Sequence, residues 1–339
     1  MNNVVVTGGC GYIGAQTIVE LLRHTHYNVI SIDNFSNSTA ESIERIRRIT
    51  GKTIINYSVD LCSLPELEGV FGEIGSIVGV IHFAALKSVP ESVMDPIMYY
   101  KNNLESLLNI IKCCDLYSVR NFIFSSSCSV YGNVDSLPVA EKTPLGELLS
   151  PYAHTKLIGE EIIGRASARL DMSFVLLRYF NPAGADISGL IGELPNQIPT
   201  TLVPVICQTG GGQRAKMCIF GGTHETPDGT CVRDYVHVVD VALAHIAALD
   251  FLVAGKNDDR CSLFNLGSGT GISVLEAIAS FERVSGVSIK YEITTRREGD
   301  VSAIYSDSSL AQRVLGWSPK YAIDEVMASA WKWHRHIFK

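Results

Sequence analysis

The sequence predicts an α/β protein with a Rossmann-type doubly wound parallel sheet and a smaller C-terminal α/β lobe. Two observations lead to this prediction. Short apolar runs alternate with longer amphipathic stretches through the first half of the chain, and a glycine-rich loop directly follows the first run. After Asn181 the alternation stops, and prolines and glycines become frequent. Alternating strand and helix patterns are typical of βαβ units around a buried parallel sheet, whereas the later segment indicates a second lobe.

Six apolar runs rich in Val, Ile and Phe are the predicted strands of the sheet. They are Asn3–Thr7, Asn28–Asp33, Thr53–Ser58, Gly79–Ala84, Asn121–Ser126 and Ser173–Tyr179. The stretches between them, including Ala15–Arg23 and Thr39–Arg48, place apolar residues at helical spacing. Residues 1–180 are therefore expected to form the first domain.

The second half is predicted to be divided between the two lobes. Val238–Leu252 has the pattern of a helix and Ser262–Leu266 that of a strand, so we expect residues 237–265 to return to the first domain. A helix near Ile323–Phe338 is expected to complete the second lobe, which spans residues 181–339. The length of 339 residues suits two lobes better than one core.

Composition excludes several classes of protein. Apolar residues make up 46% of the chain and charged residues 19%, which is ordinary for a globular protein. The net charge of −7 argues against a nucleic-acid partner, because such proteins present basic surfaces. An anionic ligand would need locally placed arginines.

The N-terminal segment and the cysteines indicate a cytoplasmic protein. Met1–Val6 lacks the basic start and long apolar stretch of a signal peptide, and no apolar run reaches the length of a membrane span. The nine cysteines are scattered without a Cys-x-x-Cys pair. Neither a disulfide framework nor a metal site is expected.

The loop after the first strand has the spacing of a dinucleotide-binding turn. Gly9, Gly11 and Gly14 fit G-x-G-x-x-G, while Gly8, Gly11 and Gly14 fit its G-x-x-G-x-x-G variant. Such glycines permit a tight turn and the close approach of a pyrophosphate to the N-terminus of the next helix. Because the second strand ends at Asp33, an acid follows at the distance expected for a ribose-binding carboxylate, which favours NAD over NADP.

Tyr152 and Lys156 are four residues apart, so on a helix they share a face. The same spacing also occurs on solvated helix faces, but here it follows the glycine loop and a serine-rich strand end at Ser125–Ser127. A phenolate is a good base whose pKa is normally about 10. We expect the Lys156 ammonium and an oxidised nicotinamide to lower that pKa, and a serine hydroxyl to relay the proton.

Together these residues resemble the extended short-chain dehydrogenase/reductase superfamily, and further motifs resemble its UDP-galactose 4-epimerases. The motifs are His82–Lys87, Phe122–Ser127, Val130–Gly132, Leu177–Pro182, Asp228–Thr230, Val232–Tyr235, Asn265–Gly267 and Arg296–Asp300. They run in order from near the first strand to near the last helix. The resemblance implies a sugar-nucleotide-binding second lobe, tightly bound NAD and inversion of C4 of a UDP-hexose.

The resemblance also implies a role for individual residues. Tyr152 would be the catalytic base and acid, Lys156 its electrostatic partner and Ser127 the relay. The residues that would line NAD are Gly8, Gly11, Tyr12, Ile13, Gly14, Asp33, Asn34, Asn37, Ser38, Asp60, Leu61, Phe83, Ala84, Lys87, Asn102 and Tyr179. Those that would bind the UDP-sugar are Asn181, Thr201, Leu202, Phe220, Arg233, Tyr235, Arg297, Asp300 and Ile304. Arginines suit a diphosphate because the guanidinium donates in a fixed fork.

Several positions depart from the family pattern. Thr200 and Thr201 stand where the family usually has two asparagines, which puts one substrate contact in doubt. His154 lies between the tyrosine and the lysine, at a helical angle that indicates a peripheral position. Ile304 stands where a tyrosine narrows the sugar pocket in the family and a smaller residue admits N-acetylated sugars. Because isoleucine is intermediate in bulk and its branch can obstruct an acetamido group, UDP-glucose and UDP-galactose are the expected pair, with UDP-GlcNAc and UDP-GalNAc as an alternative.

Other functions remain as alternatives. A sugar-nucleotide 4,6-dehydratase or decarboxylase would need an acid after the relay serine, where Cys128 and Ser129 stand. A UDP-xylose epimerase, a simple dehydrogenase that releases NADH and a catalytically silent NAD-binding regulator are further alternatives. Relatives form homodimers, here through the helix around Ile97–Leu116 and the helix with Tyr152, although those apolar faces could equally be core.

Overall fold

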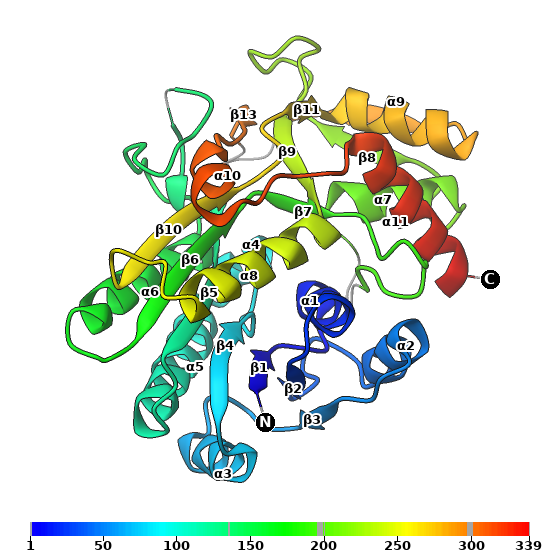
Figure 1. The fold of residues 1–339 in the computed structure, drawn as a ribbon. Coiled ribbons are helices and arrows are strands. Elements are labelled where there is room, and N and C mark those ends of the chain that lie inside the picture. The colour runs from blue at the N-terminus through cyan, green and yellow to red at the C-terminus, as the bar shows by residue number, and fades with distance from the viewer. Residues whose placement is uncertain (1, 135, 195–198, 200, 297–300, 339) are drawn as a thin grey trace.

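The fold is built on a seven-stranded, all-parallel sheet in the order β10-β6-β5-β4-β1-β2-β3 (Figure 1). The computed structural model describes residues 2–134, 136–194, 199, 201–296 and 301–338. The strands are β1 Asn3–Thr7, β2 Asn28–Ile32, β3 Ile55–Tyr57, β4 Ile77–His82, β5 Asn121–Ser127, β6 Ser173–Tyr179 and β10 Cys261–Leu266. The predicted Rossmann-type fold class is confirmed, and all six predicted strands are present.

Helices cover both faces of this sheet. On one face lie α1 Tyr12–His24, α2 Glu41–Thr50 and α8 Val238–Val253, and on the other α3 Leu64–Ile74, α5 Pro96–Leu116 and α6 Pro151–Ser167. Strand β1 shows why three apolar residues follow one another in a strand of this sheet. Val4 and Val6 pack into the first core, whereas Val5 packs into the second, because successive side chains point to opposite faces.

The strand order creates a binding crevice beside β1. The chain passes from β1 outward to β2 and β3, and then crosses back to β4 on the other side of β1. Connections therefore leave β1 and β4 in opposite directions at the carboxyl edge of the sheet. Open α/β sheets bind their ligands at such a switch point.

The second lobe contains two small sheets and a layer of helices. Strands β7 Asn181–Ala183, β9 Val232–His237, β11 Gly271–Ser273 and β13 Ala303–Ile304 form a mixed sheet, and β8 Met217–Phe220 pairs in parallel with β12 Tyr291–Thr294. The helices α7 Leu202–Gly210, α9 Val274–Ser285 and α11 Ile323–Ile337 share a core with these strands (Figure 1). The remaining helical segments are α4 Val89–Met94, η1 Cys128–Tyr131 and α10 Ser309–Leu315.

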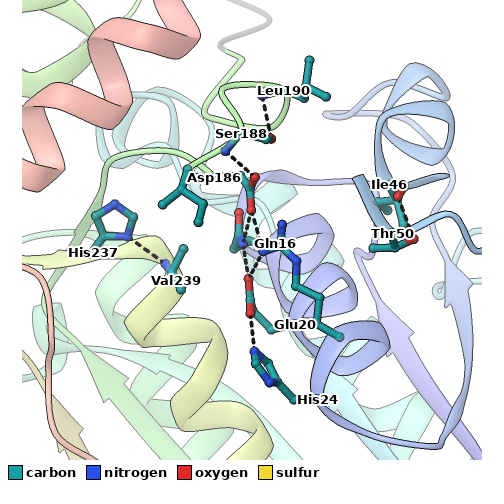
Figure 2. A network of polar contacts seen from close by, with 12 residues as sticks. Gln16, Glu20, His24, Ile46, Thr50, Asp186, Ser188, Leu190, His237 and Val239 are labelled. Carbon is teal, nitrogen blue, oxygen red and sulfur yellow. Dashed lines mark hydrogen bonds and ion pairs between the residues drawn. The ribbon is translucent and has the colours of Figure 1, made fainter. Parts of the chain in front are cut away.

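A buried polar network joins α1 to the segment that follows β7 (Figure 2). Asp186 accepts hydrogen bonds from Gln16 Nε2 at 3.1 Å and from Arg23 Nη1 at 3.0 Å. Glu20 accepts from the same two side chains at 2.8 Å each, and its second oxygen lies 3.1 Å from His24 Nε2. Since the side chains of Asp186 and Glu20 are almost fully buried, the network fixes the second lobe against the first helix.

None of the helices in the described part of the chain is long and apolar enough to cross a bilayer.

Candidate active site

A cavity of about 840 Å³ opens at the carboxyl edge of the large sheet and extends between the lobes. The first domain contributes the glycine loop and the end of β6, and the second lobe contributes residues of β7, β8, β9, α7 and α11. Such a cleft at the switch point of the sheet is the expected place for a nucleotide.

The glycine loop is shaped so that side chains would not fit. Gly8 has a φ of +67°, and a Cβ there would lie 2.8 Å from the backbone nitrogen of Ala84. A Cβ on Gly14 would lie 2.2 Å from the carbonyl oxygen of Gly8. Gly11 caps α1 without any side-chain hydrogen bond, and the first turn of α1 contains no acid. The loop therefore offers backbone N–H groups and a positive helix end to an anion, which fits a pyrophosphate.

Asp33 lies just past the end of β2 and anchors this loop. Its carboxylate accepts hydrogen bonds from the Cys10 backbone N–H at 2.9 Å, the Phe35 N–H at 2.9 Å and the Ser38 hydroxyl at 2.7 Å. Because Asp33 also lines the cavity, its carboxylate faces the place where a dinucleotide ribose would lie.

All the residues that the family resemblance assigns to NAD line this one cavity. They are Gly8, Gly11, Tyr12, Ile13, Gly14, Asp33, Asn34, Asn37, Ser38, Asp60, Leu61, Phe83, Ala84, Lys87, Asn102 and Tyr179. Two of them also connect to the second lobe. The Tyr12 hydroxyl donates to the Gly184 carbonyl at 2.7 Å, and Lys87 Nζ lies 3.1 Å from Glu193 Oε1.

The start of α6 places Tyr152 and Lys156 in the cavity. Ser150 caps the helix by accepting a hydrogen bond from the Ala153 N–H at 3.2 Å, and Pro151 occupies the first helical position. Tyr152 and Lys156 then lie one turn apart on the buried face and both line the cavity. The Lys156 ammonium donates to the Ser125 carbonyl at 2.8 Å and lies 5.0 Å from the centre of the Phe124 ring.

The expected lowering of the Tyr152 pKa is not produced by the chain alone. Burial raises the pKa of Tyr152 to about 12, against a smaller lowering by the Ser127 hydroxyl. Burial also lowers the pKa of Lys156 to about 8, partly opposed by Glu160. Burial is the largest cause of both shifts, so the phenolate would need further positive charge from a bound group.

Ser127, at the end of β5, is oriented as a relay would require. Its Oγ accepts from the Ser129 backbone N–H at 3.2 Å and lies 2.9 Å from the Ser129 hydroxyl, which donates to it. With these donors on its oxygen, Ser127 keeps its own proton for Tyr152 or for a ligand.

Glu160 is a functional residue that the sequence analysis missed. It follows Lys156 by one helical turn. Its carboxylate accepts hydrogen bonds from Ser126 Oγ at 2.5 Å and from the Arg178 guanidinium at 2.8 and 2.5 Å. The Glu160–Arg178 pair is buried, and the Glu160 carboxylate favours the charged form of Lys156. The spacing of four residues along Tyr152, Lys156 and Glu160 was a signal that could have identified it.

The residues assigned to the UDP-sugar lie mostly on the opposite wall. Asn181, Thr201, Leu202, Phe220, Arg233 and Tyr235 line the cavity. Asn181 Oδ1 is buried and has no hydrogen-bond partner in the described part of the chain, as expected for an acceptor that binds a ligand. Thr200, Arg297 and Asp300 lie outside the described residues.

Two other positions lie away from the cavity. Ile304 is buried against Val130, Tyr131, Val139 and Phe180 and is not among the lining residues. His154 is exposed, and its Nδ1 lies 2.8 Å from the Tyr100 hydroxyl, outside the cavity.

Asp234, part of the Val232–Tyr235 motif, holds the strand that carries Arg233. Its buried carboxylate accepts from the backbone N–H groups of Ser268, Gly269 and Ser306 at 2.7, 3.1 and 3.0 Å, and from two serine hydroxyls. These bonds fix β9 and thereby the neighbouring Arg233. Among the described residues, no three His, Cys, Asp or Glu side chains converge as a metal site would require.

Comparison with known proteins identifies similar chains over almost the whole length. A family model described as GDP-mannose 4,6 dehydratase matches residues 5–330. UDP-glucose 4-epimerase of Bacillus subtilis is 44% identical over 331 residues, which cover 97% of this chain and 96% of the relative.

Solved structures agree with this likeness. UDP-glucose 4-epimerase from Bifidobacterium longum, in complex with NAD+ and UDP, superposes with a TM-score of 0.93 at 43% identity, covering 99% of this chain and 98% of that one. UDP-glucose-4-epimerase from Stenotrophomonas maltophila, with bound NAD and formylated UDP-arabinopyranose, gives a TM-score of 0.95 at 41% identity, covering 100% and 99%.

Proposed function

Since the chain belongs to the UDP-glucose 4-epimerases, a family within the extended short-chain dehydrogenases/reductases, we propose that it interconverts UDP-galactose and UDP-glucose. The observation that carries this proposal is that the glycine loop, the Tyr152–Lys156 pair and Arg233 all line one cavity. A catalytically silent regulator would have no need of this complete set of side chains.

NAD is the cofactor that the cavity fits. The glycine loop would hold its pyrophosphate, Asp33 its ribose, and Tyr179 and Phe83 would line the nicotinamide end. When bound, NAD would accept a hydride from C4 of the sugar and return it to the opposite face, so that no net oxidation occurs.

Tyr152 moves the proton that accompanies this redox step. As a phenolate it takes the proton of the 4-hydroxyl, and as a phenol it returns that proton to the oxygen of the 4-keto sugar. Lys156 stabilises the phenolate by its charge, and Ser127 bridges the phenol and the sugar hydroxyl. Glu160 and Arg178 keep the lysine side of the site rigid.

The second lobe would bind the nucleotide firmly and leave the sugar free to turn. Arg233 would pair with the diphosphate, and the unsatisfied Asn181 Oδ1 would accept a hydrogen bond from the substrate. Inversion at C4 requires that the keto sugar present its other face while the UDP stays in place. The strong contacts should therefore end at the diphosphate.

One experiment tests the proposed reaction. The purified protein, without added cofactor, is incubated with UDP-galactose, and the nucleotide sugars are separated by chromatography. Formation of UDP-glucose without net release of NADH is the expected result. If UDP-galactose remained unchanged even with NAD supplied, or if NADH accumulated in proportion to substrate, the proposal would be rejected.

We also propose that the chain forms a homodimer through α5 and α6. Helix α5 and the preceding α4 expose large apolar side chains: Met94 is 85% exposed, Ile97 74% and Leu108 51%. Exposed apolar surface of this kind marks an interaction site. Sedimentation should give a dimer for the native chain and a monomer for Leu108→Asp, whereas Val253→Asp, at an exposed apolar residue of α8, should leave the dimer intact.

A reducing compartment, the cytoplasm, is the proposed location. All nine cysteines lie in the described part of the chain and are thiols rather than disulfides. Proteins that work in oxidising compartments commonly pair such residues.

A further inference from the structure

Cys231 and His224 form a pair on the wall of the cavity that the proposed epimerase reaction does not use. The distance between Cys231 Sγ and His224 Nε2 is 3.2 Å. Cys231 lines the cavity as Arg233 and Tyr235 do, and is 8% exposed. Arg233 lowers the pKa of Tyr235 and a thiolate at Cys231 would raise it, so both side chains lie close to Tyr235 at the proposed nucleotide site.

The hydrogen bonds on the other side of the ring determine which atom carries the proton. Arg296 Nη2 lies 2.6 Å from His224 Nδ1, and the Ser302 hydroxyl lies 3.0 Å from the same nitrogen. A guanidinium can only donate, so Nδ1 is the acceptor. In the neutral imidazole the proton is therefore on Nε2, which donates it to the sulfur of Cys231.

This arrangement favours the thiolate form of Cys231. The sulfur accepts a hydrogen bond from an N–H group that is polarised by a permanent positive charge on Arg296. Arg233 adds a second positive charge nearby, as its lowering of the Tyr235 pKa indicates. Cys231 is buried within the protein but lines the cavity, and cysteines in electropositive surroundings that a reactant can reach are the reactive ones.

The backbone holds His224 in this position. Gly221, with a φ of +85°, lies directly under the ring, and a Cβ there would be 2.4 Å from Nε2. The His224 N–H donates to the Gly229 carbonyl at 2.9 Å, and the Thr226 hydroxyl donates to the Thr230 carbonyl at 2.7 Å. The loop is thus closed on itself, and it presents the imidazole to Cys231 without any need for a conformational change.

The other cysteines lack such a donor. Cys218 also lines the cavity and is more exposed, but its S–H donates to Glu292 Oε1 at 3.5 Å. Burial raises the pKa of the remaining thiols, which are Cys10, Cys62, Cys113, Cys114, Cys128, Cys207 and Cys261. Exposure alone would therefore predict that Cys218 is the most reactive thiol, whereas the contacts with His224 and Arg296 predict Cys231.

We propose that Cys231 is a redox-modification site whose sulfur is oxidised by a small peroxide to a sulfenic acid. The thiolate sulfur attacks one peroxide oxygen, an S–O bond forms and the O–O bond breaks. The departing hydroxide combines with the thiol proton to give water, so the sulfur loses two electrons and the peroxide gains two. Two molecules of a thiol reductant restore the cysteine through a mixed disulfide.

The modification would regulate access to the nucleotide site. The added oxygen lies beside Arg233, where the diphosphate of the substrate is expected, so oxidation should weaken nucleotide binding. Bound nucleotide should in turn shield the sulfur. This consequence rests on the proposed function, whereas the chemistry of the thiol does not.

The test measures the chemistry directly. The full chain is treated with hydrogen peroxide in the presence of dimedone, which traps sulfenic acids, and each cysteine peptide is quantified by mass spectrometry. Cys231 should be labelled about tenfold more than Cys218, and UDP should protect it. Arg296→Gln, at an exposed position, and His224→Leu should each lower the labelling of Cys231 by about tenfold.

Controls separate the site from general effects. Cys218→Ser should leave the labelling of Cys231 unchanged, and thermal unfolding checks that the His224 variant is folded. If Cys218 were labelled as strongly as Cys231, or if Arg296→Gln labelled like the native chain, the proposal would be overturned. A chain that was labelled at Cys231 but showed no epimerase activity and no protection by UDP would disprove the proposed function and leave the thiol site standing.

Discussion

Tyr152 shows how strongly the proposed base depends on a bound group. Burial raises its pKa to about 12, so the chain alone keeps the phenol protonated at neutral pH. Lys156 donates its hydrogen bond to the Ser125 carbonyl, and its charge is itself disfavoured by burial. The positive charge of an oxidised nicotinamide would change this balance. The base would therefore form only when the cofactor is in the state that can accept a hydride.

Replacement of Tyr152 by Phe removes the group that moves the proton and leaves the cavity shape unchanged. We expect a loss of turnover of about a thousandfold or more, because general acid–base catalysis contributes on this scale. Bound NAD, released by denaturation and quantified, should stay at the native level. A variant that lost its NAD together with its activity would indicate a structural role for the phenol, and native-like turnover would exclude it as the base.

Ile304 stands at the position that we propose controls which sugars the site admits. It packs inward against Tyr131 and Phe180 rather than lining the cavity, so it adds no bulk on the sugar side. We expect UDP-GalNAc to be converted as well as UDP-galactose. Ile304→Tyr should lower kcat/KM for UDP-GalNAc about tenfold more than for UDP-galactose, since steric exclusion costs 1 to 3 kcal/mol, or about 10- to 200-fold. Competition assays with both sugars measure the ratio directly, and an unchanged ratio would contradict this role.

Residues could be predicted where a short motif dictates the chemistry. The glycine loop and Asp33 follow from their spacing, and Tyr152 and Lys156 follow from theirs in combination with that loop and the serine-rich strand end. Residues that hold the cavity-lining side chains in place, without lining the cavity themselves, could not be predicted so directly. Glu160 and the partners of Asp234 come together only when separate elements pack, and the inward packing of Ile304 depends on β13 lying beside β9.

At the scale of elements, the parallel strands were predictable and the small second-lobe strands were not. Buried parallel strands are continuous apolar runs, as Val4 to Val6 illustrate, because both faces of the sheet are covered. In contrast, β8 and β12 have four residues each and pair across more than seventy positions. Four residues are too few for an alternating pattern to predict a strand. The tertiary packing of the second lobe stabilises these two strands.

The contact between α1 and the segment after β7 should be a main source of stability between the lobes. Asp186→Asn keeps the size of the side chain but removes the charge that Arg23 and Gln16 face. We expect a loss of about 2 kcal/mol in the free energy of unfolding, because a buried hydrogen bond to a charged group contributes about 1.5 to 3 kcal/mol, while Glu20 still faces Arg23 in the variant. Urea unfolding measures this loss.

The matched control lies on α2, where Arg47 pairs with Glu44 on the surface. Glu44→Gln should leave the urea midpoint unchanged, because exposed ion pairs contribute little. Equal effects of the two substitutions would show that burial of the Asp186 network adds nothing to stability.

At the scale of the whole molecule, three of the buried histidines in the described part of the chain, His82, His237 and His245, fold into its core without charge. Burial lowers the pKa of His82 to about 3, and of His237 and His245 to about 4. Each is held by hydrogen bonds: His82 Nδ1 lies 2.8 Å from the Thr7 hydroxyl, His237 Nε2 3.0 Å from Ser329 Oγ and His245 Nδ1 2.8 Å from the Val241 carbonyl. They lie in the sheet, in β9 and in α8, so their titration reports on both lobes.

These histidines should make the folded chain sensitive to mild acid. An unfolded histidine binds a proton near pH 6.5, whereas these three stay neutral in the folded chain until about pH 4 or below. The unfolded state therefore binds more protons below pH 6.5. The stability that the neutral rings provide is complete above that pH and is lost as the pH falls. The slope should reach about 4 kcal/mol per pH unit between pH 6 and 5, from about 1.4 for each histidine.

Urea unfolding at a series of pH values measures this slope, and two variants assign it. In His245→Gln the amide oxygen can still accept a hydrogen bond from the Ser125 hydroxyl. The slope of stability against pH should fall by the contribution of one histidine, about 1.4 kcal/mol per pH unit. His26→Gln, at an exposed site, should leave it unchanged. The window above pH 5 matters because ordinary carboxylates titrate below it, near pH 4. A flat stability profile from pH 6.5 to 5 would contradict this prediction, because it would mean that the three rings are protonated in the folded chain.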